Sequence, residues 1–281
     1  MTDKVCVITG GTDGIGKASA AALAAAGERL LIHGRDPEKG ARVVAELKAQ
    51  SGNPAIEFLA ADFGSLAEVR RLAAAIKERT RRVDVLINNA GGIFAKRTLS
   101  TDGYELTFAV NHLAPFLLTH LLLDSVKTAA PSRIVTTSSI AHKGAKLVLD
   151  DLQASRRYSP MGAYGTSKLA NILFTRALAK RLQGTGVTAT CLHPGFVRTS
   201  FGRAFDQSPW IKHIFGFVSH FARSPEKGAE TVVYLATSPQ VEGASGGYYF
   251  DCELKPPSLA AQDDRLAEQL WQVSERLVGV A

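Results

Sequence analysis

Positions 5–16 read VCVITGGTDGIG, a continuous apolar run that passes directly into a glycine-rich turn. An unbroken apolar run such as Val5–Ile8 is typical of a strand buried on both faces of a sheet. Gly10, Gly14 and Gly16 have the spacing GxxxGxG, and an alanine-rich helical stretch follows to about Ala26. A bare turn is the alternative, but a strand, a glycine turn and a helix in this order favour nucleotide binding. Glycine lets the backbone approach a pyrophosphate that faces the positive end of the helix.

The alternation of strand and helix patterns continues along the 281 residues. Further strands are expected near Leu30–Ile32, Ile56–Leu59, Val83–Ile87, Arg133–Thr137, Val187–Leu192 and Tyr248–Phe250. Helices are expected from Pro37 and near 65–80, 104–129, 161–183, 225–237 and 262–278. This order predicts an α/β fold, a single-domain, Rossmann-type, doubly wound parallel sheet of about seven strands with helices on both faces.

Two segments interrupt the alternation, the polar stretch 140–160 and the aromatic stretch 198–222. Both follow strands of the predicted parallel sheet, and open α/β sheets bind ligands at the carboxyl ends of their strands. We therefore expect one domain over 1–281, with 198–222 as its substrate loop. The amphipathic helix 262–278 is expected to pack on the core.

Composition excludes several classes of protein. Apolar residues make up 46% and charged residues 21%, which is ordinary for a globular chain and wrong for disorder. The net charge of +7 suits anionic ligands, but the basic residues are scattered and we expect no nucleic-acid partner. Three isolated cysteines and an N-terminus that enters a strand at once predict a reduced, cytoplasmic protein without a signal peptide. The most apolar stretch, Leu113–Leu123, predicts no transmembrane segment, and no metal site is expected.

The end of the second strand, His33-Gly34-Arg35-Asp36, bears on the choice of cofactor. An acidic residue at this tip would accept from the ribose hydroxyl of NAD, whereas an arginine suits the 2′-phosphate of NADP. Arg35 therefore predicts NADP(H) in preference to NAD(H), and the alternative is a surface arginine paired with Asp36 or Glu38. Asp62, after the third strand, is expected to accept from the adenine amino group, or else to lie at a helix N-cap.

Tyr164 and Lys168 lie four positions apart in a predicted helix and so share one face. A free tyrosine has a pKa near ~10, and a nearby ammonium and a positive nicotinamide ring are expected to lower it toward ~7. Ser139 ends a predicted strand, where it can donate to a substrate oxygen. Asn111 lies on a preceding helix, and Asn88-Asn89-Ala90-Gly91 follows the fourth strand, where amides can tie strand ends together. Tyrosine beside a lysine in this setting predicts acid/base catalysis.

Five motifs occur along the chain in this order: TGGTDGIG, NNAG at 88–91, Ser139, Tyr164-x-x-x-Lys168 and Pro194-Gly195. Taken together, they resemble the short-chain dehydrogenase/reductase superfamily. The resemblance covers essentially the whole chain. A closer resemblance is to the branch of retinol dehydrogenases and protochlorophyllide reductases. It rests on VNHLAPF at 110–116, SKLANILF at 167–174 and the 25-position interval from Ser139 to Tyr164.

The resemblance implies roles for several residues. Tyr164 would exchange a proton with the substrate oxygen, Lys168 would lower the pKa of Tyr164 and hold the nicotinamide ribose, and Ser139 would orient the substrate. Asn111 would hold a water that relays protons to Lys168. The implied cofactor-binding set is Gly10, Thr12, Asp13, Gly14, Ile15, Gly16, Arg35, Asp62, Phe63, Asn89, Ala90, Gly91, Thr137, Tyr164, Lys168, Pro194, Gly195, Val197 and Thr199. Asp13 departs from the pattern, because an acid near phosphates is unfavourable unless it turns away.

The expected activity is therefore hydride transfer between NADP(H) and the carbonyl or alcohol carbon of a small apolar substrate, as in a carbonyl reductase. A non-catalytic NADP-binding sensor on the same fold is the alternative. The chain is expected to be a monomer or homodimer. The aromatic segment 198–222 is expected to be a lid over the site, with peripheral membrane contact as the alternative.

Overall fold

The computed structural model describes residues 4–197 and 223–281, and within them eight strands form one sheet in the order β3-β2-β1-β4-β5-β6-β7-β8. The strands are β1 (Val5–Ile8), β2 (Arg29–Gly34), β3 (Ile56–Ala60), β4 (Val85–Asn88), β5 (Ser132–Thr137), β6 (Val187–Leu192), β7 (Tyr248–Phe250) and β8 (Glu253–Leu254). The first seven pair in parallel and β8 pairs antiparallel with β7. The predicted α/β class with a doubly wound sheet is confirmed, and the short β8 is one strand more than expected.

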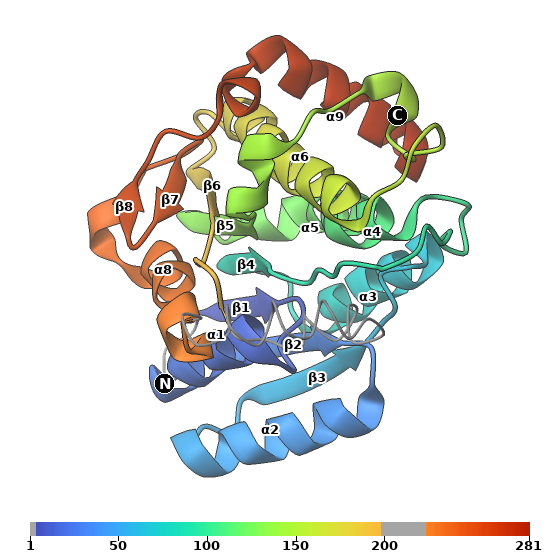
Figure 1. Ribbon diagram of the computed structural model, residues 1–281. Coiled ribbons are helices and arrows are strands. Elements are labelled where there is room, and N and C mark those ends of the chain that lie inside the picture. The colour runs from blue at the N-terminus through green and yellow to red at the C-terminus, as the bar shows by residue number, and fades with distance from the viewer. Residues whose placement is uncertain (1–3, 198–222) are drawn as a thin grey trace.

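Helices cover both faces of the sheet (Figure 1). They are α1 (Gly14–Ala25), α2 (Pro37–Ser51), α3 (Leu66–Arg79), α4 (Leu106–Phe108), α5 (Ala114–Thr128), α6 (Pro160–Arg181), α8 (Pro225–Thr237) and α9 (Asp264–Val278). Short 3₁₀ turns lie at Ile140–Gly144, Leu149–Asp151, Pro239–Val241 and Leu259–Gln262. The side chains of α1, α2 and α8 fill the core on one face, and those of α3, α5 and α6 fill the core on the other.

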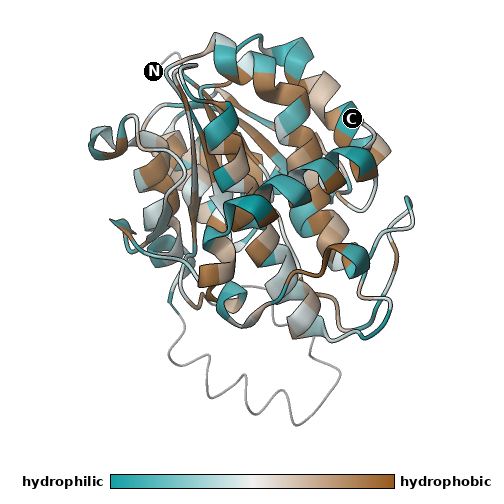
Figure 2. Cartoon of the chain, turned by 90° about the horizontal axis from the view of Figure 1, so that it is seen from above, coloured by the Kyte–Doolittle hydropathy of each residue, from teal (hydrophilic) through white to brown (hydrophobic). Residues whose placement is uncertain are grey.

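The alternation of β1 shows why its whole sequence is apolar. Val5 and Val7 belong to the core on one face, whereas Cys6 and Ile8 belong to the core on the other. Successive side chains of a strand point to opposite faces, so a strand covered on both sides buries every residue. Figure 2 shows hydrophobic residues concentrated on the strands and on the helix faces turned toward them.

The helix predicted over 104–129 is not uniform. A π-helical turn, Ala109–Leu113, lies between α4 and α5 and contains Asn111. π-turns inside helices frequently mark functional sites. The combined run Leu106–Thr128 has 23 residues and is long and apolar enough to cross a membrane by composition, although 72% of its most apolar window is buried inside the protein. This run is therefore longer than Leu113–Leu123, the apolar stretch from which no transmembrane segment is expected.

Candidate active site

The glycine-rich loop between β1 and α1 has a backbone that only glycine allows. Gly10 has a φ of +66°, in the left-handed region, and a Cβ there would lie 2.8 Å from the Cα of Ala90. A Cβ on Gly16 would lie 2.1 Å from the carbonyl oxygen of Gly10. The loop is therefore packed against both the start of α1 and the end of β4. This cradle, at the N-terminus of a helix, fits a dinucleotide pyrophosphate.

Asn89 ties the ends of β1 and β4 together, as the sequence predicts. Its Nδ2 donates to the carbonyl oxygens of Thr9 at 3.0 Å and Gly10 at 3.3 Å. The Thr9 hydroxyl in turn accepts from the backbone N–H groups of Asn89 at 3.0 Å and Ala90 at 3.1 Å. These contacts hold the glycine-rich loop in register with the NNAG segment.

His33, which sequence reasoning missed, supports the same loop from β2. Its Nδ1 accepts from the N–H of Gly10 at 3.4 Å, so Nε2 carries the proton and donates to the carbonyl of Ala61 at 3.0 Å. The ring stacks on Phe63 with centroids 4.2 Å apart, and burial lowers the pKa of His33 to about 4. A polar side chain within a buried strand is the only signal that the sequence offered.

Asp13 caps α1 by accepting from the N–H of Gly14 at 2.8 Å. Its other carboxylate oxygen forms an ion pair with Lys39 at 2.6 Å. The carboxylate of Asp13, whose negative charge is unfavourable near cofactor phosphates, is thus held at the N-cap of α1 and paired with Lys39.

The three residues expected at the adenosine end of the site, Arg35, Asp62 and Phe63, differ in exposure and in hydrogen bonding. Arg35 is exposed and has no hydrogen bond or ion pair with any residue in the described part of the chain. The alternative pairing of Arg35 with Asp36 or Glu38 is absent there. Asp62 is exposed and accepts from the N–H of Gly64 at 2.8 Å, while Ser65 is the N-cap of α3. The side chain of Phe63 is buried in the core, so only its backbone can face a ligand.

Tyr164, Lys168 and Ser139 meet at the carboxyl end of β5. The phenol of Tyr164 makes a hydrogen bond with Ser139, and the Lys168 ammonium lies 5.6 Å from the centroid of the tyrosine ring. Lys168 Nζ donates to the carbonyl of Thr137, the last residue of β5, at 3.1 Å. The Ser138 hydroxyl donates to the carbonyl of Lys168 at 2.7 Å, which fixes α6 to the end of β5.

The pKa of Tyr164 in the protein itself moves opposite to the expectation. Burial raises the pKa of this phenol to about 12, and the hydrogen bond with Ser139 opposes that rise. Burial also lowers the pKa of Lys168 to about 8. Desolvation disfavours the charged form of each group, so it raises the pKa of the phenol and lowers the pKa of the ammonium. The surrounding protein therefore keeps the phenol protonated, as an acid, at neutral pH.

Asn111 uses its side chain to hold neighbouring segments. Its Oδ1 accepts from the N–H of Gly92 at 2.8 Å, and its Nδ2 donates to the Gly92 carbonyl and to the Ser167 hydroxyl, both at 2.9 Å. A Cβ on Gly91 would lie 3.1 Å from Asn111 Oδ1 and 3.3 Å from Lys168 Nζ. A side chain at position 91 would therefore crowd both groups, which glycine avoids.

The segment after β6 follows the carboxyl end of the strand that pairs with β5. Gly195 has a φ of +81°, and its N–H donates to Nδ1 of His193 at 3.1 Å. A Cβ on Gly195 would lie 2.9 Å from Cδ of Arg223, so Pro194-Gly195 is packed against the chain beyond residue 222. Val197 forms a parallel bridge with Arg223. Thr199 and the expected substrate loop 198–222 lie outside the described residues.

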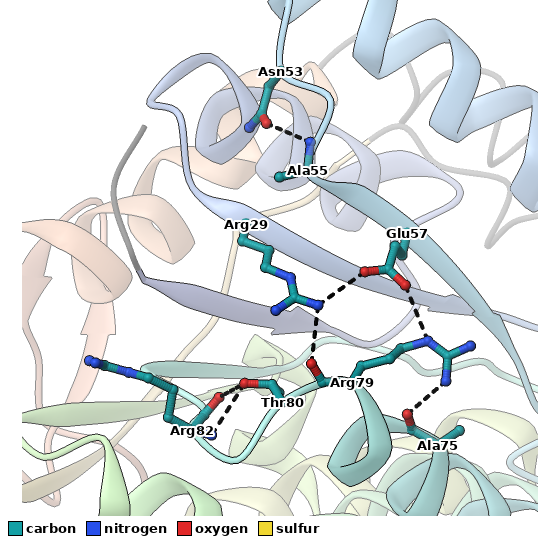
Figure 3. Close-up of polar contacts among 8 residues, drawn as sticks. All are labelled: Arg29, Asn53, Ala55, Glu57, Ala75, Arg79, Thr80 and Arg82. Carbon is teal, nitrogen blue, oxygen red and sulfur yellow. Dashed lines mark hydrogen bonds and ion pairs between the residues drawn. The ribbon is translucent and has the colours of Figure 1, made fainter.

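Three of the arginines lie near the start of β2 and the end of α3 (Figure 3). Arg29 begins β2, and its Nη2 donates to Glu57 at 3.2 Å. Arg79 reaches the same carboxylate through Nε at 3.2 Å (Figure 3). Arg82 pairs with Asp84 at 2.5 Å. Each of these arginines is therefore engaged with a carboxylate, away from the candidate site.

Comparison with known proteins agrees with this geometry. Residues 4–209 match the family model described as short chain dehydrogenase. The chain is 41% identical to retinol dehydrogenase 14 of Homo sapiens, covering 100% of this chain and 88% of the relative. It is 42% identical to retinol dehydrogenase 12 of Mus musculus, covering 99% and 87%.

Solved structures show the same fold. An uncharacterized protein from Mycobacterium paratuberculosis superimposes with a TM-score of 0.79 at 31% identity, covering 98% of this chain and 93% of the other. The Pseudomonas aeruginosa RhlG/NADP active-site complex has a TM-score of 0.70 at 27% identity, covering 88% and 94%. From the family model and the full-length relatives, the chain belongs to the short-chain dehydrogenase/reductase family and is similar to its retinol dehydrogenases.

Proposed function

We propose that this protein is an NADP(H)-dependent oxidoreductase that interconverts a carbonyl and an alcohol on an apolar substrate, with Tyr164 as the acid/base. The observation that carries the proposal is the grouping of the Tyr164 phenol, the Ser139 hydroxyl and the Lys168 ammonium beside the glycine-rich cradle. An acid/base pair has no use in a sensor that only binds the nucleotide.

The proposed chemistry assigns one task to each side chain. When bound, the nicotinamide supplies or accepts the hydride. During reduction, Tyr164 transfers its phenolic proton to the substrate oxygen, so that the carbonyl becomes an alcohol. Ser139 donates a hydrogen bond to the same oxygen, and Lys168 stabilises the phenolate that remains. Asn111 holds Gly92 and Ser167 through hydrogen bonds. Its further proposed role is to hold a water that relays protons to Lys168.

The preference for NADP(H) rests on Arg35. Its guanidinium is exposed just beyond β2 and is not engaged by a carboxylate of the described residues. A guanidinium in that position suits a 2′-phosphate through a charge-assisted contact. The NADP complex of RhlG, a structural neighbour, supports the same choice.

The substrate class rests on apolar side chains beside the catalytic residues. Ile140 follows Ser139 directly, Met161 lies three residues before Tyr164, and Phe196 follows Pro194-Gly195. The three are exposed by 48%, 54% and 49%. Large apolar side chains exposed around a polar centre favour an apolar ligand. The retinol dehydrogenase relatives support a bulky hydrophobic alcohol or aldehyde as its class.

The test is a cofactor-monitored screen over retinoids, steroids, aromatic aldehydes and quinones, with Tyr164→Phe as the comparison. We expect native turnover to exceed that of the variant by at least about 100-fold, because the proton donor is removed. NADPH affinity, measured by calorimetry, should stay nearly unchanged. Equal turnover by the variant would refute the proposed role of Tyr164, and no turnover by the native protein on the whole panel would favour the sensor.

A further inference from the structure

His142 is a buried histidine that the catalytic proposal does not use. It lies in the 3₁₀ turn Ile140–Gly144, three residues after Ser139, and its side chain is 0% exposed. Its Nδ1 lies 2.7 Å from the carbonyl oxygen of Ser139, and its Nε2 lies 3.1 Å from the backbone nitrogen of Ser258. One imidazole therefore bridges the expected substrate-binding serine and the chain between β8 and α9.

The two contacts determine the protonation of the ring. A backbone N–H can only donate, so Nε2 of His142 must accept from Ser258. The proton of the neutral imidazole is then on Nδ1, which donates to the Ser139 carbonyl. Tyr248, from β7, packs edge-on against the ring with centroids 5.1 Å apart and limits its rotation.

The Ser139 carbonyl receives a second donor, the backbone N–H of His142, at 3.2 Å. Ser139 itself has an extended backbone, with φ −157° and ψ 156°, and its hydroxyl accepts from the N–H of Ala141 at 3.2 Å. The backbone turn alone holds the carbonyl by one longer bond. The shorter bond from the imidazole sets the orientation of the peptide, and with it the direction of the Ser139 side chain toward Tyr164.

We propose that His142 is a positioning residue, which fixes the Ser139 hydroxyl by holding its carbonyl, and which is itself anchored on Ser258. The segment between β8 and α9 thereby controls the geometry of the active site across 116 positions of sequence. This inference rests on the proposed function, because it assumes that Ser139 contacts the substrate.

Two variants separate the two contacts of the ring. In His142→Asn, the amide nitrogen can occupy the position of Nδ1 and still donate to Ser139. In His142→Gln, the amide can reach the position of Nε2 and meet Ser258, but no polar atom lies near Ser139. We expect kcat/KM to fall about tenfold in His142→Gln, as for the loss of one positioned hydrogen bond, and to stay within about threefold of native in His142→Asn.

Matched measurements distinguish positioning from a general loss of structure. Tm and NADPH affinity should be similar in the two variants, and Ser258→Ala, which keeps the backbone N–H, should leave activity unchanged. In a Ser139→Ala background, His142→Gln should cause no more than about a twofold further loss, because the two residues act through one contact. Equal losses in the Asn and Gln variants, or additive losses with Ser139→Ala, would overturn the inference.

A measurement on the native chain covers the case in which the variants do not fold. Imidazole ¹⁵N NMR of the intact protein at pH 8 should show His142 as the neutral Nδ1–H tautomer, and the Nε2–H tautomer would contradict the bridge. Failure of the proposed function looks different. If Tyr164→Phe or Ser139→Ala remains fully active, the catalytic assignment falls whatever His142 does.

Discussion

The buried ammonium of Lys168 shows how a residue of the proposed catalytic group lowers the stability of the fold. Lys168 is 3% exposed, and its nearest hydrogen-bond acceptor is the neutral carbonyl of Thr137. Burial lowers its pKa to about 8, from 10.5, so the folded state holds the proton less tightly than the unfolded chain. Such a group destabilises the fold while it is charged, and active sites commonly trade stability for activity in this way.

Lys168→Met should therefore stabilise the protein at neutral pH. Because the folded pKa is depressed, the destabilisation is complete below about pH 8 and disappears as the pH rises toward 10.5. Urea unfolding at pH 7 should show a gain of up to about 3 kcal/mol, reduced by the lost bond to Thr137. At pH 10 the difference between the two proteins should narrow. An unchanged difference at both pH values would contradict the burial of a charged lysine.

Arg35 gives a second prediction at the scale of one residue. The native protein should bind NADPH more tightly than NADH, and Arg35→Ala should remove the preference, because the guanidinium would contact only the 2′-phosphate. Calorimetric titration with each cofactor measures both affinities. Arg42→Ala is the matched control, since Arg42 lies in α2 and pairs with Glu38 at 3.8 Å. Equal affinity of the native protein for the two cofactors would refute the assignment.

At the scale of elements, α9 packs along α6, the helix that carries Tyr164 and Lys168 (Figure 1). Trp271 of α9 contacts residues of both α6 and α5. Its ring stacks on Phe174 with centroids 5.9 Å apart and meets Phe116 edge-on at 4.9 Å. Arg181 covers the ring at 4.1 Å. The terminal helix is therefore core packing, as its amphipathic pattern predicts.

Trp271→Ala should lower the free energy of unfolding by about 3–5 kcal/mol, because it leaves a cavity between α6 and α9. Trp271→Phe keeps an aromatic ring and should cost much less. Urea denaturation of the three proteins measures the difference. A loss below about 1 kcal/mol in the alanine variant would show that the contact relaxes or contributes little.

At the scale of the whole molecule, the reactivity of the cysteine thiols shows whether the sheet is folded or open. Cys6 lies in β1 and Cys191 in β6, each 1% exposed, whereas Cys252 is partly exposed after β7. Burial raises the pKa of both strand thiols, that of Cys191 to about 12. Thiols that are buried and protonated react slowly.

A thiol reagent should therefore modify Cys252 quickly in the native protein and the other two only after unfolding. The slow phase should follow the same urea dependence as the loss of circular dichroism. Cys252→Ser should abolish the fast phase and leave the slow one. Rapid modification of two thiols in the native state would mean that the sheet opens locally.

Much of the fold and part of the site follow from local sequence patterns. Each of these patterns spans only a few neighbouring positions: the run Val5–Ile8, the glycines after it, and the interval between Tyr164 and Lys168. Steric limits on glycine, the two-residue period of a strand and the helical turn therefore reveal them without any knowledge of packing. The family resemblance, drawn from these same motifs, is confirmed by the relatives.

Only the tertiary structure decided which contacts support these motifs and in which direction the pKa values of their side chains move. The bridge from His142 to Ser258 and the support of Gly10 by His33 join segments far apart in sequence. The rise in the pKa of Tyr164 comes from desolvation, which exists only once the surrounding chain has packed. Local patterns carry no information on such contacts, because hydrogen bonds and burial across the molecule depend on three-dimensional proximity.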